Sequence, residues 1–102
     1  MTINYQNREL HIVVSQYTSN DRLYVGFLEK DGEIYGDITV NLKESDNLPD
    51  DMAYVDVNNM FQITAIINNY RLGKYMGEVA KSGFCEYPLY KFDMEELRKY
   101  YI

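Results

Sequence analysis

Apolar and polar residues alternate along much of the first forty positions. Apolar residues recur at every second position in 10–14, again in 23–27, and again from 34 to 42. A period of two is typical of a β-strand with one buried face. The pattern therefore predicts three strands here, separated by a turn at 18–21 and a tight turn at Asp31-Gly32.

The dipeptide Asp31-Gly32 favours a two-residue hairpin loop, because such loops need positive φ angles. That loop would place Lys30 opposite Glu33, Val25 opposite Ile38 and Leu23 opposite Val40. The second strand would then present one apolar face, made of Ile34, Gly36, Ile38, Val40 and Leu42. The other face of the hairpin would carry Tyr24, Tyr35, Asp37, Thr39 and Asn41, which a slip of one residue would bury.

The middle of the chain predicts a loop, a short strand and a helix. Residues 43–52 hold four carboxylates and a proline without periodicity, which indicates an exposed loop. We expect a strand at 53–57 and, after it, a helix that continues through Leu72. The expected buried face of this helix is Met60, Ile63, Ile66, Ile67 and Tyr70, its candidate N-caps are Asp56, Asn58 and Asn59, and Gly73 is its candidate C-cap.

The last thirty residues predict a loop, a strand and a short helix. Three glycines and mixed charge within 73–83 indicate a loop, with an extra turn over 75–80 as an alternative that the sequence leaves open. The strand at 84–92 would carry Cys85, Tyr87 and Leu89 on one face and Phe84, Glu86, Tyr90 and Phe92 on the other. Because Pro88 has no N–H, it should place this strand at a sheet edge or in a bulge. Asp93 followed by Glu96 resembles a capping box for a helix with an apolar stripe of Met94, Leu97 and Tyr101.

The predicted order is therefore β-β-β-β-α-β-α. This order favours an α+β fold with a mostly antiparallel sheet of about five strands and with the helices packed on one face. The 102 residues, of which 46% are hydrophobic, are expected to form a single domain over 1–102.

Charge and cysteine content narrow the classes of function. Sixteen acidic residues against ten basic ones give a net charge of −6, which disfavours direct binding to nucleic acid. We expect no membrane span and no secretory signal. The single cysteine, Cys85, cannot form an internal disulfide, so we expect a soluble cytoplasmic protein.

Few residues could carry catalysis. A thiol and an imidazole could form a nucleophilic pair, but no known signature surrounds His11 or Cys85. The adjacent carboxylates at 50–51 and 95–96 fall in segments expected to be exposed, where a raised pKa is hard to achieve. The chain also has no metal-ligand spacing and no phosphate-binding glycine loop. We therefore expect no catalytic residue, no metal and no cofactor.

Tyrosine is the one compositional excess, with eleven residues. Tyrosine combines a large rigid contact area with a polar end and is enriched at interfaces. The hypothesis is that a tyrosine-bearing face, or the edge strand beside it, binds another protein. The candidate residues are Tyr24, Tyr35, Glu86, Tyr87 and Tyr90.

Two segments resemble a known family: Ala-Tyr-Val-Asp-Val-Asn-Asn at 53–59 and Ser-Gly-Phe-Cys-Glu-Tyr-Pro-Leu-Tyr-Lys-Phe-Asp at 82–93. The family is a group of short uncharacterised proteins, a domain of unknown function, carried on conjugative transposons and related mobile elements of Gram-positive gut bacteria such as clostridia. The resemblance spans about 38–93 and includes Gly73 and Gly77. It implies a cytoplasmic bacterial setting, accessory to a mobile element, and implies no catalytic or binding residue.

Three functions are compatible with these observations. The first is a non-enzymatic protein-interaction module that serves the mobile element. The second is an acidic mimic of DNA that inhibits a host restriction or defence nuclease. The third is an enzyme whose site forms around Cys85 or around carboxylates that meet only in the folded chain.

Overall fold

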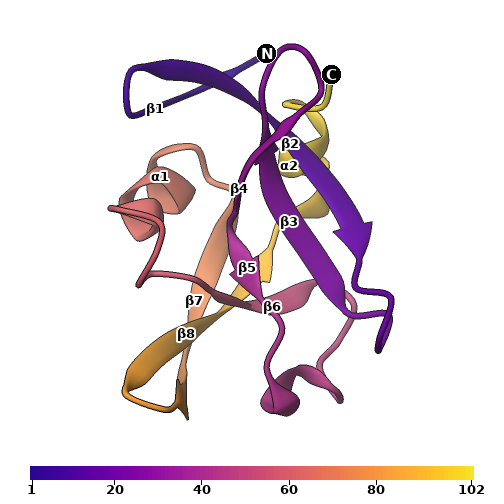
Figure 1. The fold of residues 1–102 in the computed structure, drawn as a ribbon, viewed down its shortest axis with the longest axis vertical. Helices are drawn as coiled ribbons and strands as arrows, with labels where there is room; N and C mark the ends of the chain where they lie inside the picture. Colours follow the sequence, from indigo (N-terminus) through magenta and orange to yellow (C-terminus); the bar gives the residue numbers. More distant parts are fainter.

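The computed structural model covers residues 1–102 and has two antiparallel four-stranded sheets with two short α-helices (Figure 1). The first sheet has the order β1-β2-β3-β4 and the second has the order β5-β6-β8-β7. The α+β class and the antiparallel pairing are confirmed, although the strands form two sheets rather than one. The elements are β1 (Ile3–Tyr5), β2 (Arg8–Gln16), β3 (Leu23–Leu28), β4 (Ile34–Asp37), β5 (Thr39–Val40), β6 (Met52–Val55), α1 (Ile63–Asn69), β7 (Gly73–Ser82), β8 (Cys85–Phe92) and α2 (Met94–Arg98).

The chain passes from the first sheet to the second between β4 and β5. Ile38 and Thr39 are consecutive and both buried, because the chain changes direction between them and joins β6. Thr39 therefore does not lie on an exposed polar face, contrary to expectation. Val40 pairs with Tyr54 and not with Leu23, because β5 belongs to the second sheet.

The β3–β4 hairpin keeps most of its predicted register but has a different turn. Gly26 pairs with Asp37 and Phe27 with Gly36, and the Ile38 N–H donates to the Val25 carbonyl at 2.9 Å, as the predicted register requires.

The β3–β4 loop has three residues, 30–32, because Glu29 and not Lys30 lies opposite Glu33. Of these three residues only Gly32 has a positive φ, +89°. A bulge after Phe27 absorbs the extra residue, and it leaves Ile34 58% exposed rather than on the apolar face.

The prediction of a loop at 73–83 is wrong, because these residues form the whole of β7 and begin its turn into β8. The pairing with β8 shifts between Tyr75 and Val79, so three residues of β7 bulge at Gly77, which has a φ of +83°.

Pro88 does not place β8 at an edge, since β8 lies between β6 and β7. The missing N–H is tolerated for two reasons. The pairing of β6 with β8 ends at Tyr54 and Leu89 and does not reach Pro88, and the bulge of β7 lies beside the proline.

Helix α1 is shorter than predicted, and Gly73 does not cap it. The helix closes with a Schellman motif in which the Leu72 N–H donates to the Ile67 carbonyl at 2.9 Å and the Arg71 N–H donates to the Asn68 carbonyl at 3.2 Å. The left-handed residue of this motif is Arg71, with φ +58°, and not a glycine.

At the helix N-termini one of the predicted caps is present. The Asp56 carboxylate accepts from the Asn59 N–H and side-chain amide, which caps a turn before α1 rather than α1 itself. Asp93 caps α2 as predicted, because its carboxylate accepts from the N–H groups of Glu95 and Glu96 at 3.1 and 3.2 Å.

The main hydrophobic core lies between the two sheets and the helices. Both helices contribute to this one core through Ile63, Ile67 and Leu97, which fits the expectation that the helices pack on one face. The last core residue of the C-terminal stripe is Tyr100 rather than Tyr101. The other members are Ile3, Tyr5, Leu10, Ile12, Leu23, Val25, Phe27, Ile38, Ala53, Val55, Met60, Leu72, Tyr90 and Phe92.

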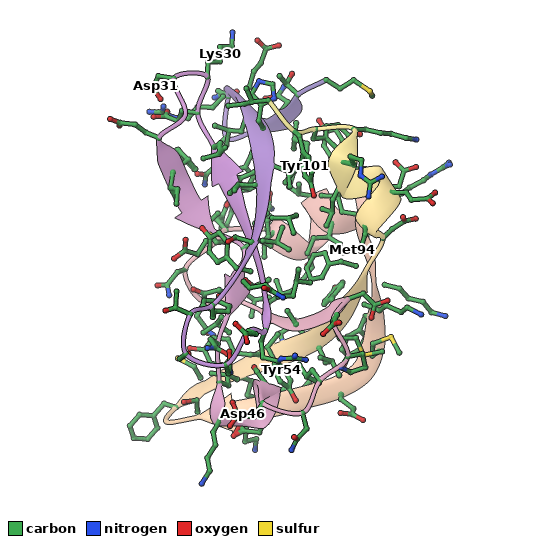
Figure 2. The ribbon with its side chains drawn as sticks, turned by 90° about the vertical axis from the view of Figure 1, so that its right-hand side faces the viewer. Lys30, Asp31, Asp46, Tyr54, Met94 and Tyr101 are labelled. Atoms are coloured by element: carbon green, nitrogen blue, oxygen red, sulfur yellow. The ribbon has the colours of Figure 1, made fainter.

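A second, smaller core covers the opposite face of the second sheet. It consists of Tyr54, Ala80 and Leu89. Leu48 of the carboxylate-rich segment 43–52 and Leu42, just before that segment, pack against it. In Figure 2, Asp46 of this segment and Tyr54 lie near the same end of the molecule, whereas Lys30 and Asp31 lie at the other end. The segment expected to be a simple exposed loop therefore shields one face of a sheet, and β8 contributes side chains to a core on each of its faces.

Candidate interaction surface

Strand β7 forms the free edge of the second sheet. It is ten residues long, pairs only with β8, and lies with β8 in a hairpin that extends to one end of the molecule (Figure 1). An edge strand presents alternate N–H and C=O groups with no partner strand. These groups can bind an extended segment of another chain by adding it to the sheet.

Large apolar side chains are exposed along this edge. Tyr75 is 46% exposed, Val79 is 49% exposed, and Met76 and Phe84 are also exposed. We call these four residues the β7 surface. Strand β1, an edge of the first sheet, is less accessible than β7. It has only three residues, and its Asn4 N–H donates to the hydroxyl of Tyr70, in the turn after α1, at 2.9 Å.

The register shows which backbone groups of β7 face outward. Val79 lies directly opposite Pro88, which has no N–H. Antiparallel pairs alternate between hydrogen-bonded and non-hydrogen-bonded sites, so the proline must occupy a non-hydrogen-bonded site. The N–H and C=O groups of Val79 therefore point away from β8.

The structure separates the two hairpin tyrosines among the predicted site residues. Tyr24 packs edge-on against Tyr17 at 5.5 Å between ring centroids, and its hydroxyl donates to Asp37 at 2.5 Å. Burial, and then the hydrogen bond and charge of Asp37, raise the pKa of Tyr24.

Tyr35 instead packs against the main core through Tyr5, at 6.2 Å between ring centroids. The Arg8 guanidinium lies 5.2 Å from the centre of the Tyr35 ring, and the Tyr35 hydroxyl donates to Gln6 at 3.1 Å. Because of the β4 bulge, Tyr24 and Tyr35 do not form one surface.

Of the three predicted site residues in β8, only Glu86 is exposed. Tyr90 is 4% exposed and belongs to the main core, so the expectation that it lies on a free face is wrong. Tyr87 packs partly buried against the second core, and burial, followed by its hydrogen bond with the Cys85 thiol, raises its pKa. Glu86 lies 3.7 Å from Lys81 of β7 in an ion pair.

The exposed strand beside these residues was missed because its sequence has no clean period of two. Gly73 and Gly77 indicated a loop, and the bulge at 76–78 breaks the alternation. A weak signal was present in the apolar residues Tyr75, Met76 and Val79 between the glycines.

The structure does not bring the candidate nucleophile and base together. The His11 Nδ1 lies 3.1 Å from the Tyr100 carbonyl, after α2, whereas Cys85 pairs with Ser82 at the β7–β8 turn. Figure 1 shows α2 and this turn at opposite ends of the molecule.

The adjacent carboxylates do not form an acid–base site either. Asp50 forms an ion pair with Arg22 at 3.3 Å, and Glu96 forms one with Lys99 at 2.7 Å. A trio at the β3–β4 turn, Glu29, Asp31 and Glu33, brings carboxylate oxygens within 4.8 Å of one another at the surface. Exposed acidic groups are commonly this close without an ion.

None of the helices is long and apolar enough to span a membrane. No curated protein and no solved structure matches the chain. A family described as a domain of unknown function, DUF4313, matches residues 11–101, which includes both segments that carried the resemblance. The chain belongs to the DUF4313 family.

Proposed function

We propose that this domain is a non-enzymatic protein-interaction module that binds an extended segment of another protein along β7. The observation that carries the proposal is a long free edge strand that also exposes large apolar side chains. Strand addition supplies affinity through backbone hydrogen bonds and specificity through alternate side chains.

The partner is a different protein rather than a second copy. Two copies would each carry a net charge of −6, and their mutual repulsion opposes association. The bulge at Gly77 and the charged residues Lys74, Glu78 and Lys81 also interrupt β7, as they do in edges that avoid self-pairing. The regular part from Val79 to Ser82 remains available to a partner strand.

The proposed setting is the cytoplasm of a Gram-positive bacterium, where the domain would be an accessory of a mobile element. This part rests on the sequence resemblance alone. Mimicry of DNA has less support, because six of the carboxylates pair with lysine or arginine side chains rather than forming rows of free charge.

The test replaces Val79 with lysine, since a charge on an edge strand blocks strand addition without entering a core. The matched control is Ile34→Lys, which changes an exposed β-branched residue of β4 that is 58% exposed, against 49% for Val79. Each variant would be tagged and purified from a clostridial host that carries the element, with nuclease treatment and at two salt concentrations.

We expect the parent and Ile34→Lys to retain one stoichiometric protein partner that resists nuclease and high salt, and Val79→Lys to lose it. Hydrogen exchange on the complex should show new protection at the Val79 and Lys81 amides. Recovery of the same partner by Val79→Lys, or protection elsewhere, would refute the β7 surface. Capture of a nuclease that dissociates at high salt would favour mimicry of DNA instead.

A further inference from the structure

The largest concavity of the molecule lies where the end of α1, the start of β7, the end of β8 and the start of α2 meet. Its volume is about 660 Å³, and Phe92 and Met94 are its apolar lining residues. Figure 2 shows Met94 at the start of α2, beside this region. Six charged residues line the rest of it: Asp51, Arg71, Lys74, Lys91, Asp93 and Glu95. We call this concavity the α1–α2 groove.

Most basic residues of this acidic chain have a carboxylate partner, but two of the three in the groove do not. Six of the ten form ion pairs, which leaves Lys43, Arg71, Lys74 and Arg98. Two of these four, Arg71 and Lys74, line the groove. Half of the cations without an ion pair therefore lie in one concave site, although the chain has sixteen acidic residues.

Two of the three carboxylates of the groove already have a partner within the protein. Asp51 pairs with Lys91 at 3.9 Å, and Asp93 accepts the two N–H groups that it caps on α2. Glu95 is the one acidic residue of the groove whose carboxylate has neither an ion pair nor a hydrogen bond. Arg71 and Lys74 therefore outnumber the unoccupied acid by two to one.

The register adds an independent observation. Lys74 of β7 lies directly opposite Lys91 of β8. Like charges in this position destabilise a sheet. The Asp51 carboxylate, 3.9 Å from Lys91, offsets only one side of this pair. An anion between the two lysines would turn the repulsion into two favourable contacts.

We propose that the α1–α2 groove binds a small anion, a carboxylate or phosphate group, held by Lys74, Lys91 and Arg71. The backbone of Arg71 is held beside the groove because it closes the Schellman motif of α1. Its guanidinium can donate two parallel hydrogen bonds to either anion. This site is separate from the β7 surface and does not depend on the function proposed above.

The test is a titration followed by ¹H–¹⁵N NMR, with pyrophosphate and succinate as the two probes, at constant ionic strength with chloride as the background anion. We expect millimolar or tighter binding with shifts confined to amides around 71–75 and 91–95. The two probes distinguish a phosphate site from a carboxylate site. If neither shifts these amides, the proposal is wrong.

Substitutions in the groove should change the affinity for the anion in opposite directions. Lys74→Gln and Arg71→Gly should each weaken binding about tenfold, and Arg71→Gly cannot do so by unfolding because glycine is favoured at that backbone position. Glu95→Gln should strengthen binding about twofold, since it removes a repulsive charge. Lys81→Gln, on the same strand outside the groove, is the control. Equal weakening by Lys81→Gln and Lys74→Gln would refute the site.

A second readout does not depend on affinity. Without anion, Lys74→Gln should melt at a higher temperature than the parent, because the repulsion with Lys91 is removed. On addition of the anion the parent should gain more in melting temperature than the variant. An unchanged difference between the two proteins would contradict the proposal.

Discussion

The hydroxyl oxygen of Thr39 in β5 accepts a hydrogen bond from the N–H of Val25 in β3 at 3.1 Å. The Tyr17 hydroxyl lies 3.0 Å from the same oxygen. One buried side chain therefore links the two sheets at the point where the chain passes between them. Valine has the same shape as threonine but cannot form either hydrogen bond.

We expect Thr39→Val to lower the free energy of unfolding by about 1–3 kcal/mol, because it leaves the buried Val25 N–H without an acceptor. Urea denaturation, compared at equal m-values, measures this change. Tyr17→Phe is the control and should cost about 0.5–1.5 kcal/mol, because it removes one hydrogen bond and leaves Val25 paired. An effect of Thr39→Val no larger than that of Tyr17→Phe would contradict a linking role for Thr39.

Arg71→Gly should raise the free energy of unfolding by about 1 kcal/mol. Arg71 has a φ of +58°, which costs a residue with a Cβ about 1–2 kcal/mol. Glycine avoids this cost, although its greater freedom in the unfolded chain reduces the gain. Thermal unfolding in an anion-free buffer measures the difference.

The matched control is the glycine two residues later. A Cβ on Gly73 would lie 2.9 Å from the Lys91 carbonyl oxygen, so Gly73→Ala should cost about 1–3 kcal/mol. If Arg71→Gly were destabilising, Arg71 would not be the left-handed residue that closes α1. If Gly73→Ala were neutral, the close approach of Gly73 to the Lys91 carbonyl would be wrong.

The stability of the protein should fall in alkaline solution. Tyr24 has a raised pKa from burial and from Asp37, and burial also raises the pKa of Tyr5, Tyr17, Tyr54 and Tyr90. A raised pKa means that the folded state favours the neutral phenol. Its contribution is therefore complete below about pH 10, the ordinary tyrosine value, and is lost as the pH rises further.

Urea midpoints measured from about pH 8 to about pH 11 should stay level and then decrease above about pH 10. Tyr24→Phe should be less stable at neutral pH, because its hydrogen bond to Asp37 is lost, but should decrease less steeply. Equal slopes for the parent and the variant would show that Tyr24 does not contribute to the alkaline transition.

Local periodicity predicted the parts of the fold in which one face is buried. The alternation around Val25 and Ile38 predicted their pairing, and the spacing of Ile63 and Ile67 predicted the buried face of α1. Asp93 capped its helix as its position suggested. These features depend on a few neighbouring residues, so sequence alone can specify them.

The remaining features depend on contacts distant in the sequence. Strand β7 is exposed over most of its length, so it lacks the apolar period by which strands are recognised. The burial of Tyr90 could not be anticipated, because β8 has apolar residues on both faces and a core on each side. The cross-strand Lys74–Lys91 pair depends on the bulge, which the sequence does not place.

The first sheet is also closed by the last residues of the domain. The Ile12 N–H donates to the Tyr100 carbonyl at 2.9 Å, and Tyr100 covers the main core next to it. During synthesis the N-terminal strands leave the ribosome first, yet their cover is translated last. The apolar surface of the N-terminal half therefore stays exposed to water until Tyr100 has been synthesised. A chain that stops before Tyr100 would keep this surface exposed, and we expect chaperones or proteases to bind it.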